Sequence, residues 1–106
     1  MDEFIKNKIA DLNQRAQKIW VNPNAEDHVI AICLFSSPDE SIHQGWFSHW
    51  NSKSIVSSYY DSYIAEGKNL IQVLNYLDEY LSIAEELSEK LIKDGERIVE
   101  EIGFAD

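Results

Sequence analysis

The chain has 106 residues, 44% hydrophobic and 26% charged, with a formal net charge of −10. This length supports one domain, residues 1–106, and the composition excludes wholesale disorder. The longest apolar run, Val29 to Phe35, is far shorter than the ~20 residues that cross a bilayer, so we expect no contact with a membrane.

The charge is concentrated after residue 24. Residues 1–24 carry four cations and three anions, whereas residues 25–106 carry five cations and sixteen anions. Such a surface repels nucleic acid and predicts protein partners with a basic surface. The N-terminus has acids where a signal peptide would be basic, so we expect a cytoplasmic location.

The first element is predicted to be an amphipathic helix from Asp2 to Trp20. Its apolar residues recur at helical spacing: Ile5, Ile9, Leu12, Ala16 and Ile19. Proline cannot continue a helix, so Asn22-Pro23-Asn24 should end this one. Asn24 would then cap the next segment.

The apolar run Val29–Phe35 is open to two interpretations. Periodicity does not separate a buried helix from a buried strand in so short a run. The cap at Asn24 and the lack of an alternating partner segment favour a helix. The alternative is a central strand.

Two further short helices are predicted in the middle of the chain. In Ser37-Pro38-Asp39-Glu40, serine at the N-cap, proline at the first helical position and glutamate at the third form a capping box. The helix that it starts would contain Trp46, Phe47 and Trp50. A second helix would run from Ile55 to Ala65.

One heptad register runs through the last third of the chain. It contains Leu70, Leu74, Leu77, Leu81, Ala84, Leu91, Ile98 and Ile102. An unbroken helix from about Lys68 to Ile102 would be roughly 50 Å long. It would extend beyond a domain whose radius of gyration should be near 13 Å. Either the helix breaks near Gly95, or its far end contacts another molecule.

The acids of this helix and the mid-chain tyrosines are the candidate binding residues. The acids lie mainly on the face opposite the apolar stripe, where they would imitate a phosphate backbone for a basic groove. Tyrosine is favoured at protein interfaces. The partner-binding residues that we predict are Glu85, Glu86, Glu89, Glu96, Glu100, Tyr60 and Tyr63.

No motif predicts a reaction, a metal site or a cofactor. His28, His43, His49 and Cys33 have no zinc-ligand spacing, and Glu40-Ser-Ile-His43 lacks the second motif of a di-iron site. The chain also lacks a nucleophile elbow and a glycine-rich phosphate loop. We therefore predict a protein that is not an enzyme.

The region around Trp50 resembles the WXG-type secreted helical hairpins. The shared features are a length near 100 residues, an acidic composition, a mid-chain Trp50-Asn51-Ser52 turn and a long heptad helix. Ser52 stands where that family has glycine, and the family's C-terminal export signal is missing. The resemblance implies two long helices and secretion.

The sequence as a whole predicts a small all-α bundle with a long C-terminal heptad helix; the alternative is an α+β fold with residues 29–35 as a strand. The expected core is Ile5, Ile9, Leu12, Ile19, Val29, Ile32, Leu34 or Phe35, Trp46, Leu70, Leu74, Leu77, Leu81 and Leu91. We predict an acidic protein that blocks a basic, nucleic-acid-binding site on a partner, as phage inhibitors and toxin-immunity proteins do. The alternatives are a self-associating helical module and the WXG-like hairpin.

Overall fold

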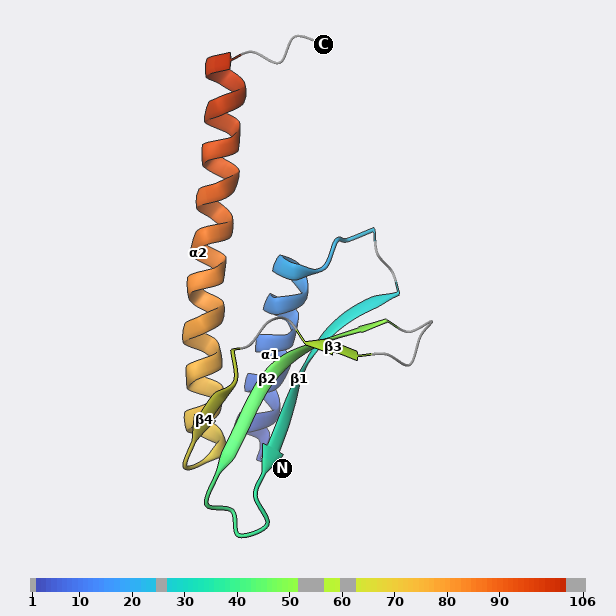
Figure 1. Cartoon of the computed structure of the whole chain (residues 1–106), viewed down its shortest axis with the longest axis vertical. Helices are drawn as coiled ribbons and strands as arrows, with labels where there is room; N and C mark the ends of the chain where they lie inside the picture. The colour runs from blue at the N-terminus through green and yellow to red at the C-terminus, as the bar shows by residue number, and fades with distance from the viewer. Residues whose placement is uncertain (1, 25–26, 52–56, 60–62, 103–106) are drawn as a thin grey trace.

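The protein has an α+β fold, in which two helices pack on one face of a small antiparallel sheet. The computed structural model describes residues 2–24, 27–51, 57–59 and 63–102. Figure 1 shows the elements in chain order: α1 (Glu3–Trp20), β1 (His28–Ser36), β2 (His43–Asn51), β3 (Ser57–Tyr59), β4 (Ala65–Gly67) and α2 (Leu70–Ile102). The all-α prediction is therefore wrong. The α+β alternative is partly supported, because β1 covers residues 29–35.

The sheet is built around β2. β1 pairs antiparallel with β2 along its whole length, from His28 opposite Asn51 to Ser36 opposite His43. The short strands β3 and β4 both pair with the other side of β2. β1 is thus an edge strand. The alternative interpretation, which made residues 29–35 a central strand, is wrong on this point.

Side chains of α1 satisfy the backbone groups on the outer edge of β1. The Gln17 side chain accepts a hydrogen bond from the Ile30 N–H at 2.8 Å and donates one to the His28 carbonyl at 3.0 Å. Asn13 accepts a third from the Ile32 N–H at 2.8 Å. Covering an edge in this way prevents it from pairing with another chain.

The predicted capping box at residues 37–40 is instead the turn between β1 and β2. The Asp39 carboxylate accepts hydrogen bonds from the hydroxyls of Ser37 and Ser41, both at 2.7 Å. Glu40 has a φ of 57°, in the left-handed region that turns use. Serine, proline and aspartate favour both helix starts and turns. The helix predicted after this point is wrong, because residues 43–51 form β2.

The N-terminal helix is confirmed. Asp2 caps α1 by accepting a hydrogen bond from the Phe4 N–H at 2.8 Å, and the chain is extended again at Val21. Asn24 does not cap a helix. Its N–H donates to the Asn22 side chain at 2.9 Å in a turn that leads toward β1.

The long C-terminal helix is also confirmed, and it runs through Gly95 without a break. The Asn69 side chain accepts a hydrogen bond from the Gln72 N–H, and the Gln72 side chain accepts one from the Lys68 N–H, both at 2.8 Å. This reciprocal capping fixes the start of α2. The helix gives the molecule an extent of 61 × 31 × 25 Å and a radius of gyration of 17.0 Å, well above the ~13 Å of a compact chain of this length.

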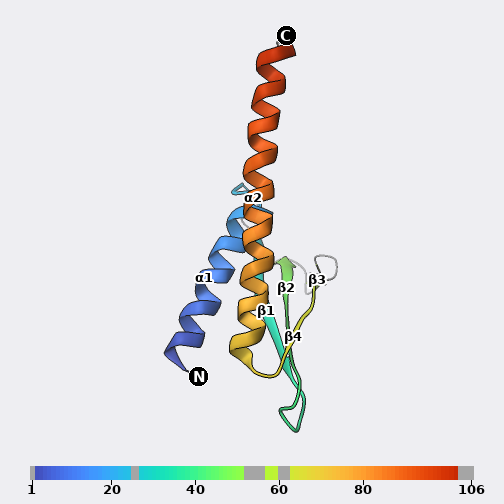
Figure 2. The ribbon, with the colours of Figure 1, turned by 90° about the vertical axis from the view of Figure 1, so that its left-hand side faces the viewer.

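The core lies between the two helices and the sheet (Figure 2). Its buried members are Leu12, Ala16, Val21, Ile30, Phe47, Ala65, Val73, Leu74, Leu77 and Leu81. Ile5, Ile9, Ile19, Ile32 and Leu34, all of them predicted core residues, pack against it. β2 approaches α2 so closely at Gly45 that a Cβ there would be 2.7 Å from Val73 Cγ1.

Two predicted core residues are on the other face of the sheet. Val29 is 48% exposed, and the half-buried Trp46 also lies on the side away from the helices, because residues on a strand alternate between faces. Ile30 and Phe47 take the core positions instead. The side chain of Leu91 lies outside the described part of α2.

Two other helical predictions fail in the same region. The helix predicted for Ile55–Ala65 is wrong where the chain is described, because residues 57–59 form β3 and Ala65 begins β4. The WXG-like hairpin is also wrong. Trp50 and Asn51 lie in β2 and not in a turn between two long helices.

Candidate protein-interaction surfaces

The acids of α2 whose side chains are described form two sets. The first set, Asp78 and Glu85, forms ion pairs with α1. Arg15 of α1 forms ion pairs with Asp78 at 3.0 Å and with Glu85 at 2.5 Å, and Lys8 forms another with Asp78. Arg15 also contacts Asp11 at 3.2 Å. The residue later in α1, Arg15, reaches the residue later in α2, Glu85, whereas the earlier Lys8 pairs with the earlier Asp78. The two helices are therefore parallel.

These ion pairs perturb the charged groups that form them. Burial by itself raises the pKa of Asp78, but the bonds from Lys8 and Arg15 outweigh it, and the pKa lies below its usual value. The bond with Glu85, followed by those with Asp78 and Asp11, raises the pKa of Arg15 despite its partial burial. Of the predicted binding residues, Glu85 is therefore engaged within the molecule.

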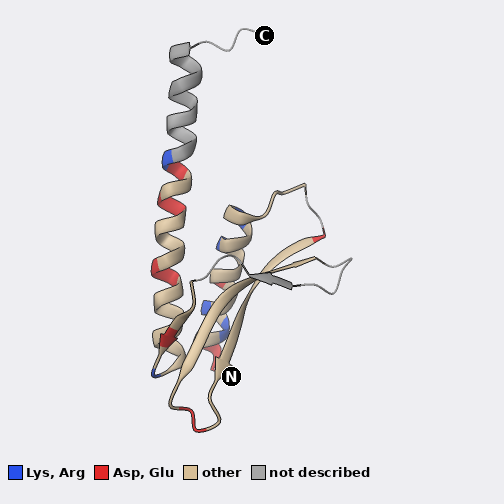
Figure 3. Cartoon of the chain, viewed as in Figure 1, with Lys and Arg blue, Asp and Glu red and all other residues tan. Residues whose placement is uncertain are grey.

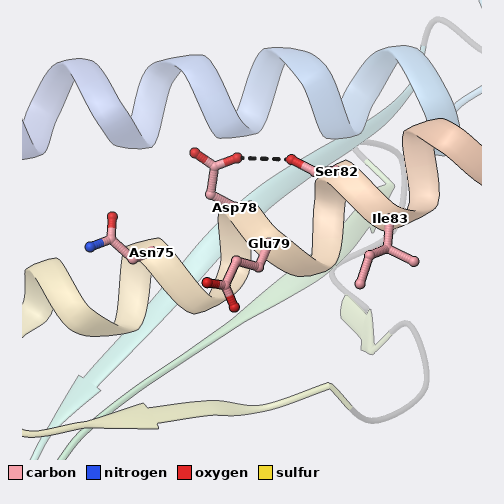
Figure 4. Close-up of a pocket in the computed structure, with 5 residues that line it drawn as sticks. All are labelled: Asn75, Asp78, Glu79, Ser82 and Ile83. Atoms are coloured by element: carbon pink, nitrogen blue, oxygen red, sulfur yellow. Dashed lines mark hydrogen bonds between the residues drawn. The ribbon is translucent and has the colours of Figure 1, made fainter.

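The second set of acids faces solvent. Glu79, Glu86 and Glu89 are all exposed on α2. Figure 4 shows the separation over one helical turn: Asp78 and Ser82 point toward α1, whereas Glu79 and Ile83 point away from it. These residues, with Asn75, line a shallow hollow on the helix surface. Glu96 and Glu100 lie in the last turns of α2, where side chains are not described.

An apolar stripe borders the exposed acids. Tyr76, Ile83 and Leu87, which we call the α2 flank, are exposed, with Ile83 at 58% and Leu87 at 56%. Their spacing places them on one side of the helix, nearly opposite the side that contacts α1. Tyr63 stacks on Tyr80 of the same region, with ring centroids 4.5 Å apart. Tyr63 is thus partly exposed beside the flank, and Tyr60 lies outside the described residues.

The sequence did not predict a second exposed apolar surface, which lies on the sheet. The face of β1 and β2 that points away from the helices, which we call the open sheet face, carries six apolar residues: Val29, Ala31, Cys33, Phe35, Trp46 and Trp50. Val29, Phe35 and Trp50 are 48%, 49% and 38% exposed. Helices α1 and α2 both lie on the opposite side of the sheet (Figure 2).

A small polar contact holds the centre of the open sheet face. Ser48 is buried, and its hydroxyl accepts hydrogen bonds from Trp46 Nε1 at 3.1 Å and from the Cys33 thiol at 3.3 Å. The contact fixes the Trp46 ring against the strand.

The histidines form local hydrogen bonds. His28 Nδ1 lies 2.8 Å from His49 Nε2 across the end of the sheet, and His43 Nδ1 lies 2.7 Å from the Ser36 hydroxyl. Zinc sites use three or four protein ligands. Among the side chains that the structure describes, no group of three metal-binding residues converges.

Comparison with family models, curated proteins and solved structures found no match to the chain. None of the helices in the described residues has the length and apolar character needed to span a membrane. The function therefore has to be argued from the surfaces themselves.

Proposed function

We propose that the chain is a binding protein that covers a basic, nucleic-acid-binding surface of a protein partner, as an inhibitor or an immunity protein does. The observation that carries this proposal is the division of acids on α2. Asp78 and Glu85 are used to hold α1, whereas Glu79, Glu86 and Glu89 are left in solvent. The helical spacing places Glu79 and Glu86 beside the α2 flank.

This combination of charge and apolar area is typical of a protein interface. An interface has an apolar centre with large side chains and a polar rim, and opposite charges on the partner increase the rate and specificity of association. Ile83 and Leu87 would provide the centre, and the exposed acids would provide the rim. A partner with Lys or Arg around an apolar patch fits this surface.

We also propose that the protein acts in the cytoplasm. Cys33 is a free, half-buried cysteine, and free thiols remain reduced in the cytosol. The net charge of −10 would prevent the protein from binding nucleic acid itself, while it competes with nucleic acid for the basic site on the partner.

The test is to capture partners from an extract of the cells that make this protein, with three forms of the chain. The first is the wild type. The second carries Glu86→Lys and Glu89→Lys. The third is a control with the same change in net charge on α1: Glu3→Lys, Asn7→Lys and Gln14→Lys, all at exposed positions.

We expect the wild type and the control to retain the same basic protein at low salt and to release it at high salt. The α2 variant should lose it at both, because reversed charges repel the basic surface. Equal retention by all three forms would contradict a role for the exposed acids.

A second candidate function is self-association through α2. The Arg15–Glu85 pair joins residues 70 positions apart, so Trp20, the last residue of α1, is level with residue 90. Residues 91–102 of α2 then extend about 18 Å beyond α1. Leu91 and Ile98 continue the heptad register there.

Sedimentation velocity distinguishes this candidate. If α2 associates with a second copy, the wild-type chain should dimerise as its concentration rises, and Ile98→Asp should remain monomeric. A wild-type monomer at every concentration would exclude self-association.

A further inference from the structure

We propose that the open sheet face binds one amphipathic helix of a partner protein, with Lys or Arg side chains at the helix end that lies over the turn between β1 and β2. This surface is on the opposite side of the molecule from the helices and is independent of the acids on α2. Three observations support the proposal.

The first observation is that β1 is apolar on both faces. Its helix-facing residues Ile30, Ile32 and Leu34 alternate with Val29, Ala31, Cys33 and Phe35 on the open side. An antiparallel strand with one face in water normally alternates between apolar and polar residues, and a continuous apolar run is typical of a strand covered on both faces. None of the described elements covers this side of β1, and the proposed partner helix would provide that cover.

The second observation is the shape of the face. β1 and β2 are each nine residues long, whereas β3 and β4 have three residues each. Two long strands form a strip about 30 Å long and about 10 Å wide. A helix is about 10 Å wide, and about 20 residues of it span 30 Å. The strip therefore matches one helix better than a second sheet.

The third observation is the distribution of charge. Residues 28–36 and 43–51 include no Asp, Glu, Lys or Arg, and Figure 3 shows both strands without coloured residues. The acids at the two ends are unequal among the described residues: Asp39 and Glu40 in the turn and Glu66, which is opposite Gln44 and so on the same face, lie at one end, whereas Asp27, directly before β1, lies at the other. The hydrogen bonds from Ser37 and Ser41 lower the pKa of Asp39 to about 2, so the turn end stays negative at neutral pH.

The same charges disfavour a second copy of the chain as the occupant. If two sheets packed with like ends together, the turn acids of the two copies would face each other. If they packed with opposite ends together, Asp39 and Glu40 of each copy would lie against Val29 and Trp50 of the other. The first arrangement opposes like charges, and the second removes carboxylates from water without a cation to pair with them. A helix with a basic end meets neither cost.

The experiment is selection from a displayed library of random 20-residue helices against the full-length chain. Each round removes peptides that also bind the variant Trp50→Ser. We expect the survivors to have apolar residues at i, i+3, i+4 and i+7 and Lys or Arg clustered at one end. In direct titration, Trp50→Ser should weaken their binding at least about tenfold, because loss of a tryptophan from a protein interface often costs that much.

Variants separate this surface from the one on α2. Glu66→Lys should weaken binding of the selected peptides. Ile83→Ser, at an exposed apolar position on the α2 flank, and the Glu86→Lys/Glu89→Lys pair should leave that binding unchanged. Circular dichroism and thermal unfolding of each variant verify that it is folded, and Phe35→Ser replaces Trp50→Ser if the latter is not.

Three results would overturn the proposal. If the selected peptides have no basic end, the proposed role of the turn acids is refuted. If no selected peptide binds the wild type more tightly than Trp50→Ser, the proposed helix-binding site is refuted. A wild-type dimer that Trp50→Ser dissociates would identify a second copy as the occupant. Because the proposed function depends on Glu86 and Glu89, each of these results leaves it standing.

Discussion

The two faces of the β1–β2 hairpin have similar chemistry and opposite environments. On the helix side, Ile30 and Phe47 are 2% and 4% exposed beneath α1 and α2. On the open side, Val29, Phe35 and Trp50 are 38–49% exposed. Apolar area removed from water stabilises the fold, whereas apolar area left in water is available to a partner. The helix side should thus control stability and the open side should control binding.

The largest effect should come from Phe47→Ala on the helix side. Phe47 contacts the Trp20 ring edge-on, with centroids 5.3 Å apart, and its removal leaves a cavity in the core. We expect a loss of about 3–5 kcal/mol in the free energy of unfolding, measured by urea denaturation. A loss below about 1 kcal/mol would mean that the helix side does not hold the fold together.

The next effect should come from Gly45→Ala, where β2 meets α2. The added Cβ would lie 2.7 Å from Val73 Cγ1, 3.0 Å from Leu34 and 3.2 Å from Leu77, and Val73 and Leu77 are fully buried. We expect a loss of about 1–3 kcal/mol from overpacking, measured by thermal unfolding. Gly67→Ala is the control, since the three atoms nearest its new Cβ all belong to the half-buried Gln72 side chain and not to the core. An equal loss in both variants would argue against close packing at Gly45.

Arg15→Met should have a smaller, pH-dependent effect. At pH 7 we expect a loss of about 1–2 kcal/mol, because the change leaves Glu85 and Asp78 short of a cation in a partly solvated site. The pKa of Asp78 is lowered in the folded state, so its stabilisation is complete above its usual pKa near 3.8 and disappears as the pH falls through the folded value. Urea denaturation should therefore show the difference between wild type and variant shrinking below about pH 4. A constant difference from pH 7 to pH 3 would contradict the ion-pair account.

The smallest change in stability should come from Trp50→Ser on the open sheet face. Because Trp50 is exposed and outside the core, we expect a change within about 0.5–1 kcal/mol in urea denaturation. Binding to the selected helices should nevertheless fall. A loss comparable with that of Phe47→Ala would erase the distinction between the two faces.

The helices could be predicted from the sequence because their signal is local. Leu12 and Ala16 in α1, and Leu74, Leu77 and Leu81 in α2, repeat at helical spacing, and each helix shows it over several turns. The end of α1 before Pro23 was equally clear. The interior of α2 was uncertain only at Gly95, where the long run of helix-forming residues outweighs one glycine.

The strands could not be predicted because their signal is not local. β1 has no alternation, since both of its faces are apolar, and β2 places Trp46 and Phe47 on opposite faces, which reads as a helical pair as easily as a strand. The contacts that decide between these states are distant in sequence. They include Gln17 on the edge of β1 and Gly45 against Val73.

The candidate sites were predicted only in part for the same reason. The acids of α2 are visible in the sequence, but Glu85 differs from Glu86 only through its contact with Arg15, 70 residues earlier. The open sheet face had one sequence signal, the run from Val29 to Phe35. That run was assigned to the core because nothing in the sequence shows that only one face of a strand is covered.

The most direct test of the proposed function is competition for the captured partner between this chain and a nucleic-acid duplex. We predict mutual exclusion: the wild-type chain should displace the duplex, and the Glu86→Lys/Glu89→Lys variant should need a much higher concentration to do so. A stable complex that contains partner, duplex and chain together would contradict the claim that the exposed acids of α2 cover a basic site.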